Sequence, residues 1–243
     1  GGLDDVVNGR VRFVEDPDQR IAEDHLRSLR LFRFFAWYGG ADQGLDAGGL
    51  AAVAQNLDGL DSLSRERVGS EILKLLGAPN PAPAVAAMRH CGVLGRVLPG
   101  ADDRALAPLV HLEGTTPSNP IRRLAVLGGQ DVGERLRLSR GDTRRLDLLR
   151  QEVGKTESAK VLGYRYGAVT AFDIALLRAA MLDGTIPADF QANAMAGAAM
   201  EFPVTASDFM PALQGLALGQ KLRELEIGWI HSDLELTRSQ LLS

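Results

Sequence analysis

The residues best suited to chemistry lie in the first forty positions, where acids and arginines recur at helical spacing on an otherwise apolar segment. A helix over residues 20–37 would present one polar strip, spanning about a third of its circumference, that holds Arg20, Glu23, Asp24, Arg27 and Arg30. Ionised Asp only accepts hydrogen bonds, and Arg only donates them. Asp24 and Arg27, three residues apart, therefore complement an amino group beside a ring acceptor. Cytosine and adenine present that edge, whereas guanine and uracil present the opposite pattern.

The same spacing also fits an ordinary ion pair on a solvated helix face, worth a few tenths of a kcal/mol. Spacing alone leaves both interpretations open. The remaining faces of this segment are apolar, with Leu29, Phe32 and Phe35 among them. We therefore expect a deeply packed helix whose polar strip faces a cleft.

The elements that must position these residues are helical almost throughout the chain. Apolar residues recur every three or four positions, as in Val68, Ile72 and Leu75. This predicts an all-α fold, an irregular array of many helices. Strand-like alternation is confined to residues 9–14, so we expect at most one short strand there, whose sheet would lie upstream of residue 1. Asp16-Pro17-Asp18 reads as a helix N-cap with proline in the first turn rather than as a metal pair.

One segment is basic although the chain as a whole is acidic. Residues 121–165 hold eleven Lys/Arg against six Asp/Glu, a charge of +5, while the whole chain carries −4. Such a region is either a surface that follows a phosphate backbone or a set of solvated helix faces. The residues we assign to RNA binding on the first interpretation are Arg122, Arg123, Arg140, Arg144, Arg145, Lys155 and Lys160.

The composition limits the class of protein to which this chain can belong. The 243 residues are 45% hydrophobic and 24% charged, as in ordinary globular proteins. No apolar run approaches the roughly 20 residues that a membrane span needs, and no signal peptide is visible. Cys91 is the only cysteine, which suits a reducing compartment, and we predict a cytoplasmic protein without membrane contact. The four histidines form no ligand pattern, so we predict no metal site in this chain.

Three stretches together resemble the class II tRNA nucleotidyltransferase and bacterial poly(A) polymerase family. The first is Gly1-Gly2-Leu-Asp-Asp5-Val, then Gly9-Arg-Val-Arg-Phe-Val, then Asp16-Pro17-x-x-Arg20-Ile-x-Glu23-Asp24-x-Leu-Arg27-x-Leu-Arg30-x-x-Arg33-Phe. The second is Leu63-Ser64-x-Glu66-Arg67-Val-x-x-Glu71-Ile-x-Lys74-Leu-Leu. The third, looser, comprises Leu136-Arg-Leu-Ser139 and the tail from Phe202 to Ile230. The resemblance covers nearly the whole chain and is most specific over residues 1–40.

The resemblance implies a role for each residue of the strip. In this family the Glu-Asp-x-x-Arg motif acts as a protein template for incoming CTP or ATP, which implies that Asp24 and Arg27 contact the base. Glu23 and Arg30 would support them, and Arg20 would brace the strip or meet phosphate. The family's catalytic head, with a Gly-Ser loop and an Asp-x-Asp pair for Mg²⁺, is not recognisable here. We therefore expect the head upstream of Gly1 and no polymerisation by this chain alone.

The resemblance also implies an organisation and a function. Residues 1–15 would be a remnant of the head, residues 16–78 the neck that recognises the nucleobase, and residues 79–243 a helical body and tail that bind RNA. The intact protein would add CMP and AMP to the 3′ end of tRNA or another RNA. The alternative is a non-catalytic helical module that binds RNA or protein. CCA addition and poly(A) addition are not distinguished over this region, and the oligomeric state stays open.

Overall fold

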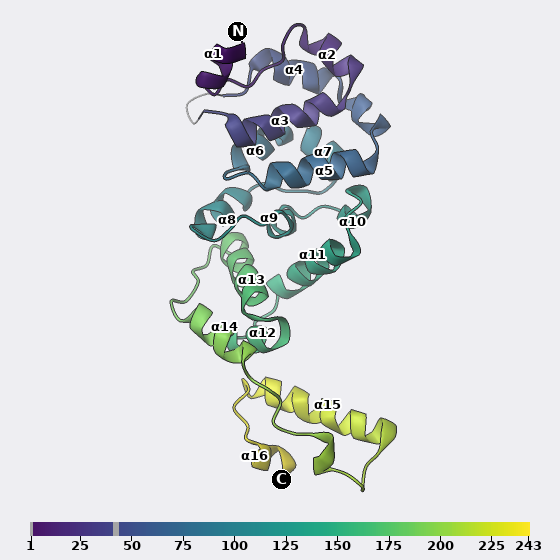
Figure 1. The fold of residues 1–243 in the computed structure, drawn as a ribbon, viewed down its shortest axis with the longest axis vertical. Coiled ribbons are helices and arrows are strands. Elements are labelled where there is room, and N and C mark those ends of the chain that lie inside the picture. Colours follow the sequence, from purple (N-terminus) through teal and green to yellow (C-terminus); the bar gives the residue numbers. More distant parts are fainter. Residues whose placement is uncertain (1, 41–43) are drawn as a thin grey trace. The chain divides into compact units, whose positions relative to one another are not determined.

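The protein is helical throughout the part that the computed structural model describes, residues 2–40 and 44–243 (Figure 1). Within these ranges there are sixteen α-helices and two short 3-10 helices. The one β-type pairing among them is an isolated bridge between Ala101 and Gly128. The prediction of an all-α, multi-helix fold is confirmed.

The possible strand over residues 9–14 does not form. α1 (Gly2–Val7) precedes this stretch, which then runs without helix or strand to Asp16. Its backbone finds local partners instead of a ladder: the Arg10 N–H donates to the Asp5 carbonyl at 2.7 Å, and the Gly9 carbonyl accepts from Gly40 at 2.9 Å. A β-strand needs a neighbouring strand to accept and donate its backbone hydrogen bonds. Because this stretch has no such neighbour in the described part of the chain, its alternating pattern of apolar residues was not enough to form a strand.

The chain divides into two compact units. The first comprises residues 1–152 and 176–184, and the second residues 153–175 and 185–243. After α1, the helices that begin in the first unit are α2 (Pro17–Glu23), α3 (Leu26–Tyr38), α4 (Ala47–Gln55), η1 (Leu57–Ser62), α5 (Arg65–Leu76), α6 (Ala82–His90), α7 (Val93–Val97), α8 (Leu106–Glu113), α9 (Pro120–Leu127), α10 (Val132–Arg135) and α11 (Arg140–Val153).

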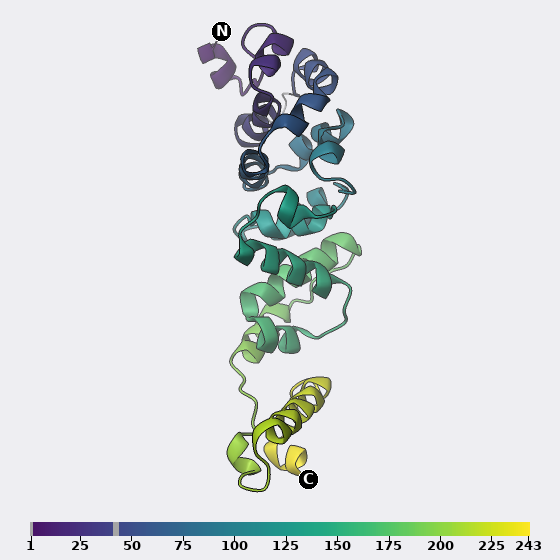
Figure 2. The same cartoon turned by 90° about the vertical axis from the view of Figure 1, so that its right-hand side faces the viewer.

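The centre of the first unit is α3, which lies beside α5 and α6 (Figure 1; Figure 2). Leu29 and Phe32 of α3 are buried, as are Ile72 and Leu75 of α5. Each such side chain contributes about 1.5–3 kcal/mol when it leaves water. Ser64 begins α5, since its side chain accepts a hydrogen bond from the Arg67 N–H at 3.4 Å. The deep packing expected of this segment is therefore present.

The helix expected over residues 20–37 is interrupted. α2 ends at Glu23, and Asp24 adopts an extended conformation with φ −156° and ψ 101°. α3 then begins at Leu26. The reason lies in the Asp24 side chain, whose Oδ1 accepts the Leu26 N–H at 3.2 Å and so competes with continuation of the helix. The polar strip is consequently built from two helix ends and the turn between them.

The second unit contains α12 (Ala159–Tyr166), α14 (Phe190–Ala198), η2 (Ala206–Asp208), α15 (Gly215–His231) and α16 (Arg238–Leu242), whereas α13 (Ala168–Met181) supplies residues to both units. α12 and α14 cross at glycines: a Cβ on Gly163 would lie 2.0 Å from the Ala194 carbonyl oxygen. Farther along the chain, Trp229 of α15 is 2% exposed and anchors a small apolar core with Val161 and Leu234. These contacts hold the tail helices to α12.

Candidate nucleotide-binding site

The turn between α2 and α3 carries the predicted template residues. Asp16 caps α2, its side chain accepting the Gln19 N–H at 2.9 Å, with Pro17 in the first turn. The interpretation of Asp16-Pro17-Asp18 as a helix start is thus confirmed. At the other end of α2, the Asp24 carbonyl accepts the Arg27 N–H at 2.9 Å. The side chains of Asp24 and Arg27 therefore project from a short, hydrogen-bonded turn rather than from a continuous helix face.

Arg27 is held by the end of α2. Its Nη1 donates to the Arg20 carbonyl at 2.9 Å and to Glu23 Oε2 at 2.5 Å. Arg20 Nη1 donates to the same Glu23 oxygen at 2.8 Å. The hydrogen bond from Arg27 is the main reason why the pKa of the Glu23 carboxyl lies below its ordinary value. The structure thus brings Arg20, Glu23 and Arg27 together, with Glu23 shared between the two guanidinium groups.

Asp24 is held separately, by arginines from α3 and α5. Arg67 Nη2 donates to both Asp24 carboxylate oxygens at 3.1 Å, and Arg30 Nη1 lies 3.8 Å from Oδ2. Partial burial raises the pKa of the Asp24 carboxyl, but the Leu26 N–H, Arg67 and Arg30 together outweigh it, and the pKa lies below its ordinary value. Asp24 is therefore an ionised acceptor.

Arg67 is the residue that sequence reasoning missed at this turn. It lies 43 positions from Asp24, so no helical spacing connects the two residues. The stretch around it resembles a neck helix of the family, but that signal assigned Arg67 no role. Only the packing of α3 against α5 brings its guanidinium to the α2–α3 turn.

A buried carboxylate fixes α3 against α5 behind the turn. Glu71 of α5 has a side chain only 7% exposed, and Arg33 Nε donates to it at 2.5 Å. Arg30 Nε lies 3.9 Å from the other Glu71 oxygen, so Arg30 stands between Glu71 and Asp24. Arg33 also lies over the Phe34 ring, with 4.2 Å between its guanidinium carbon and the ring centroid. Glu71 therefore lies beside both Arg33 and Arg30, and Arg30 in turn lies beside Asp24.

The turn can therefore present one acceptor and one donor to a planar ligand. The side chains of Asp24 and Arg27 are 25% and 28% exposed, respectively, so both are reachable from solvent. A carboxylate has about four lone-pair sites, so Asp24 can accept another hydrogen bond while Arg67 holds it. No hydrogen bond joins the Asp24 and Arg27 side chains within the described residues; Arg27 pairs with Glu23 instead, and Asp24 pairs with Arg67.

The basic segment, residues 121–165, contains both buried and accessible side chains in the structure. Arg122 and Arg123 are each only 2% exposed, and both donate to the buried Glu113 of α8. Arg123 also donates to the Leu76 carbonyl at 2.7 Å, at the end of α5. The assignment of these two arginines to RNA binding is wrong, because a guanidinium enclosed by a carboxylate and backbone carbonyls cannot reach a phosphate backbone.

The other residues of that segment have accessible side chains but lie in different units. Arg140 and Arg144 are exposed on α11, and Arg145 is half-buried, all three in the first unit. Lys155 is exposed and Lys160 half-buried in the second unit, where Lys160 Nζ lies 3.5 Å from Glu235. Their role in RNA binding stays a prediction.

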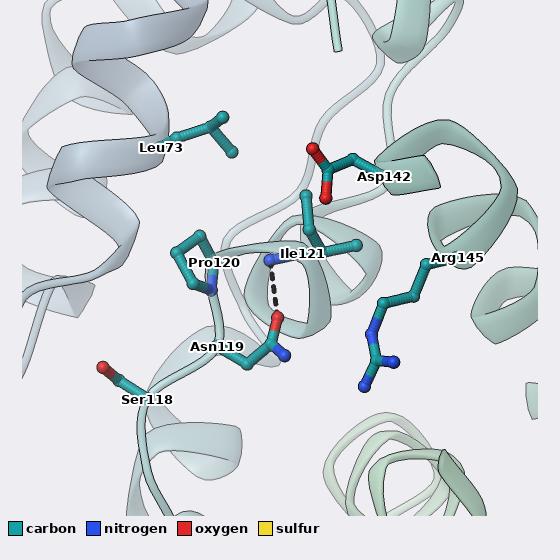
Figure 3. A pocket seen from close by; sticks show the side chains of 7 residues that line it. All are labelled: Leu73, Ser118, Asn119, Pro120, Ile121, Asp142 and Arg145. Carbon is teal, nitrogen blue, oxygen red and sulfur yellow. Dashed lines mark hydrogen bonds between the residues drawn. The ribbon is translucent and has the colours of Figure 1, made fainter. Parts of the chain in front are cut away.

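Arg145 lines a surface depression of about 480 Å³ at the start of α9 (Figure 3). Asn119 caps that helix, its Oδ1 accepting the Ile121 N–H at 2.9 Å, and Arg145 extends toward the same region from α11. The remaining lining residues are Leu73, Ser118, Pro120 and Asp142. One guanidinium and several polar groups therefore line the depression.

A family model and several curated proteins match parts of this chain. Residues 46–104 match the family described as "Probable RNA and SrmB- binding site of polymerase A". Human mitochondrial CCA tRNA nucleotidyltransferase 1 is 43% identical over 75 residues, which are 31% of this chain and 17% of that enzyme. The multifunctional CCA protein of Halorhodospira halophila is 33% identical over 141 residues, 54% of this chain and 32% of that protein. The chain is thus similar to CCA-adding enzymes over at most about half of its own length in these curated relatives.

Solved structures of CCA-adding enzymes share the fold of this chain. A complex with CTP aligns with a TM-score of 0.67 at 17% identity, over 100% of this chain and 63% of that one. The Thermotoga maritima enzyme complexed with tRNA aligns with a TM-score of 0.62 at 16% identity, over 99% of this chain and 65% of that one. The chain thus spans less than two thirds of its relatives' length.

Two further findings concern membrane-spanning helices and clusters of metal ligands. None of the described helices combines the length and apolar character needed to cross a bilayer. In the same residues, no three His, Cys, Asp or Glu side chains gather as metal ligands would.

Proposed function

We propose that this chain is the nucleobase-selecting and tRNA-binding part of an enzyme that adds CMP and AMP to an RNA 3′ end. The observation that carries the proposal is the α2–α3 turn, where an ionised, accessible Asp24 stands beside Arg27. Each has its own set of partners, so the acceptor and the donor are positioned before a ligand arrives. Pre-positioned groups lose little freedom on binding, which favours recognition of a rigid, planar base edge.

The hydrogen-bond pattern supports cytosine and adenine as the bases accepted. Asp24 would accept from the exocyclic amino group, and Arg27 would donate to the neighbouring ring nitrogen. Guanine and uracil would place donor against donor and acceptor against acceptor. Structures of CCA-adding enzymes with CTP and with ATP support CTP and ATP as the substrates.

RNA is the proposed partner of the rest of the chain. The tRNA complex of the T. maritima enzyme supports this assignment, as does the description of the family that matches residues 46–104. We propose that residues 16–78 select the base and residues 79–243 hold the RNA, with Arg140, Arg144, Arg145, Lys155 and Lys160 facing its backbone. The cytoplasm, where tRNA is matured, is the proposed location.

Among the described residues, no group of three His, Cys, Asp or Glu side chains could hold the metal ions that phosphoryl transfer requires. The absence of a ligand cluster among the described residues gives Mg²⁺ no place here, so we derive no chemical step from this chain. We propose that Mg²⁺ and the phosphoryl chemistry belong to the head that the family resemblance implies. This chain would then select and position substrates.

Binding of the four nucleoside triphosphates to the chain tests the proposal. We expect CTP and ATP to bind more tightly than GTP and UTP, and Asp24→Asn to reduce that preference about tenfold, since Asn offers a donor where an acceptor is needed. Arg104→Ala is the control, because Arg104 is 88% exposed and pairs with Asp102, away from the α2–α3 turn. Equal binding of all four nucleotides, or an unchanged preference in Asp24→Asn, would contradict the template assignment.

A further inference from the structure

A second pocket lies in the first unit among η1, α5, α7 and α10. Its volume is about 290 Å³, near the lower limit for small-molecule sites. Three of its residues are arginines from three different helices, Arg65, Arg96 and Arg135, and one is an acid, Asp61. The rest of the wall is apolar: Leu60, Leu63, Val68 and Val97.

Arg135 of α10 has an unusual environment in this pocket. The residue is half-buried, and its Nε is buried without a hydrogen-bond acceptor. Across residues 2–40 and 44–243, no side chain or carbonyl accepts from its guanidinium, although its neighbour Glu134 attracts it electrostatically. Taking a charged group partly out of water is costly unless an opposite charge or hydrogen bonds compensate it. The environment of Arg135 therefore favours an external anion.

The other two arginines are paired, but with solvent-exposed acids. Arg65 lies 2.5 Å from Glu134, with side chains 51% and 68% exposed. Arg96 lies 2.8 Å from the almost fully exposed Asp58 and also pairs with Asp61. Exposed ion pairs of this kind contribute about 0–1 kcal/mol, so an incoming anion can replace them at little cost.

Phosphate is the anion that this arrangement suits best. The planar fork of each guanidinium matches two phosphate oxygens, and arginine is the side chain most used for this contact. A phosphodiester would place its phosphate against the three arginines. The volume accommodates one such group rather than a whole nucleoside triphosphate.

We propose that Arg65, Arg96 and Arg135 form a binding site for one backbone phosphate of the RNA. This inference rests on the proposed function for the identity of the ligand, whereas the anion site rests on the pocket alone. Every lining residue except Arg135 lies within residues 46–104, so α10 supplies the arginine that completes the site. The site differs from the nucleobase turn, because Arg65 and Arg67 are two positions apart on α5 and do not share a face.

Inorganic phosphate probes the pocket without RNA. In the wild-type chain labelled with ¹⁵N, titration with phosphate should shift the Nε–H signal of Arg135. Arg135→Met should remove the saturable response of the remaining pocket arginines. The matched control is Arg137→Met, which removes the same charge two residues away, where Arg137 pairs with Glu66 outside the pocket. A urea unfolding curve for each variant establishes that it is folded.

RNA binding then tests the identity of the ligand. Arg135→Met should weaken tRNA binding about tenfold and lower the slope of log K against log salt by about 1, whereas Arg137→Met should change affinity less than twofold. Loss of phosphate binding with unchanged tRNA affinity would overturn the RNA assignment. No phosphate response in the folded wild-type chain, or an equal response to acetate, would overturn the phosphate site. Phosphate binding by a chain that binds no RNA would refute the proposed function and leave the anion site standing.

Discussion

Two Arg-Arg pairs occur in the basic segment, and they differ in how deeply they are buried. Arg122 and Arg123 lie on α9, whose residues Ile121–Leu127 are all buried. Arg144 and Arg145 lie on α11, one exposed and the other half-buried. Residue type and local charge are alike in the two pairs. The difference shows that burial of the supporting helix, rather than basic composition, decides which arginines an RNA could reach.

The buried pair has a structural role that explains its position. Glu113 accepts from Arg122 Nε at 2.9 Å and from Arg123 Nη2 at 2.6 Å. Arg123 Nη1 also donates to the carbonyls of Leu76 and Ala78, where α5 ends. These carbonyls have no partner within α5 itself, so the guanidinium satisfies the end of one helix while it anchors another. The cluster thus fastens α5, α8 and α9 together.

Replacing Glu113 with Gln should have the largest effect. Two buried guanidinium groups would lose their counter-charge, and removing one partner of a buried ion pair costs about 3–5 kcal/mol. The free energy of unfolding in urea should fall by that amount. A loss below about 1 kcal/mol would mean that water reaches the cluster.

Replacing Arg144 and Arg145 together with Ala should affect RNA rather than stability. If these side chains meet phosphates, tRNA affinity should fall about tenfold or more, and the slope of log K against log salt by about 2. Fluorescence anisotropy at several salt concentrations measures both. Unchanged salt dependence in the double variant would exclude α11 from the RNA interface. Neither of the two Arg-Arg pairs would then bind RNA.

Replacing Arg67 with Met should act on selectivity with little change in stability. Arg67 favours the ionised form of Asp24, so its removal should raise the pKa of Asp24, and the carboxylate should then be lost at a higher pH as acid is added. The preference for CTP and ATP should fall about three- to tenfold, because Asp24 is less firmly held. NMR titration of the Asp24 carboxyl carbon and nucleotide binding provide the two measurements. An unchanged pKa would show that the contact between Arg67 and Asp24 does not persist in solution.

The smallest effect is expected for Glu66→Gln. Glu66 pairs with Arg137 at 3.4 Å, with side chains 66% and 56% exposed. Exposed pairs are screened by solvent, so the free energy of unfolding should change by less than about 0.5 kcal/mol. This variant is the exposed counterpart of Glu113→Gln. A loss comparable to that of Glu113→Gln would remove the distinction between the buried and exposed pairs.

Sequence reasoning succeeded where the information is local. Helix periodicity, the Asp16 cap with Pro17, and the burial of Leu29 and Phe32 all follow from neighbours within a few residues. It failed where a side chain competes with its own backbone, as at Asp24, whose carboxylate accepts the Leu26 N–H and ends the helix. It also failed at Arg122 and Arg123, because periodicity does not reveal that a short helix will be covered on every side.

By itself, the sequence determined the all-α class, the polar strip with its donor and acceptor residues, and the family resemblance, since each depends on residue types at short spacing. Tertiary structure alone decided that Arg67 holds Asp24, that Glu113 encloses two arginines, and that Arg135 meets Arg65 and Arg96 in one pocket. These contacts join residues 9 to 70 positions apart. At such separations the packing of whole helices fixes which charges meet, and no local pattern records it.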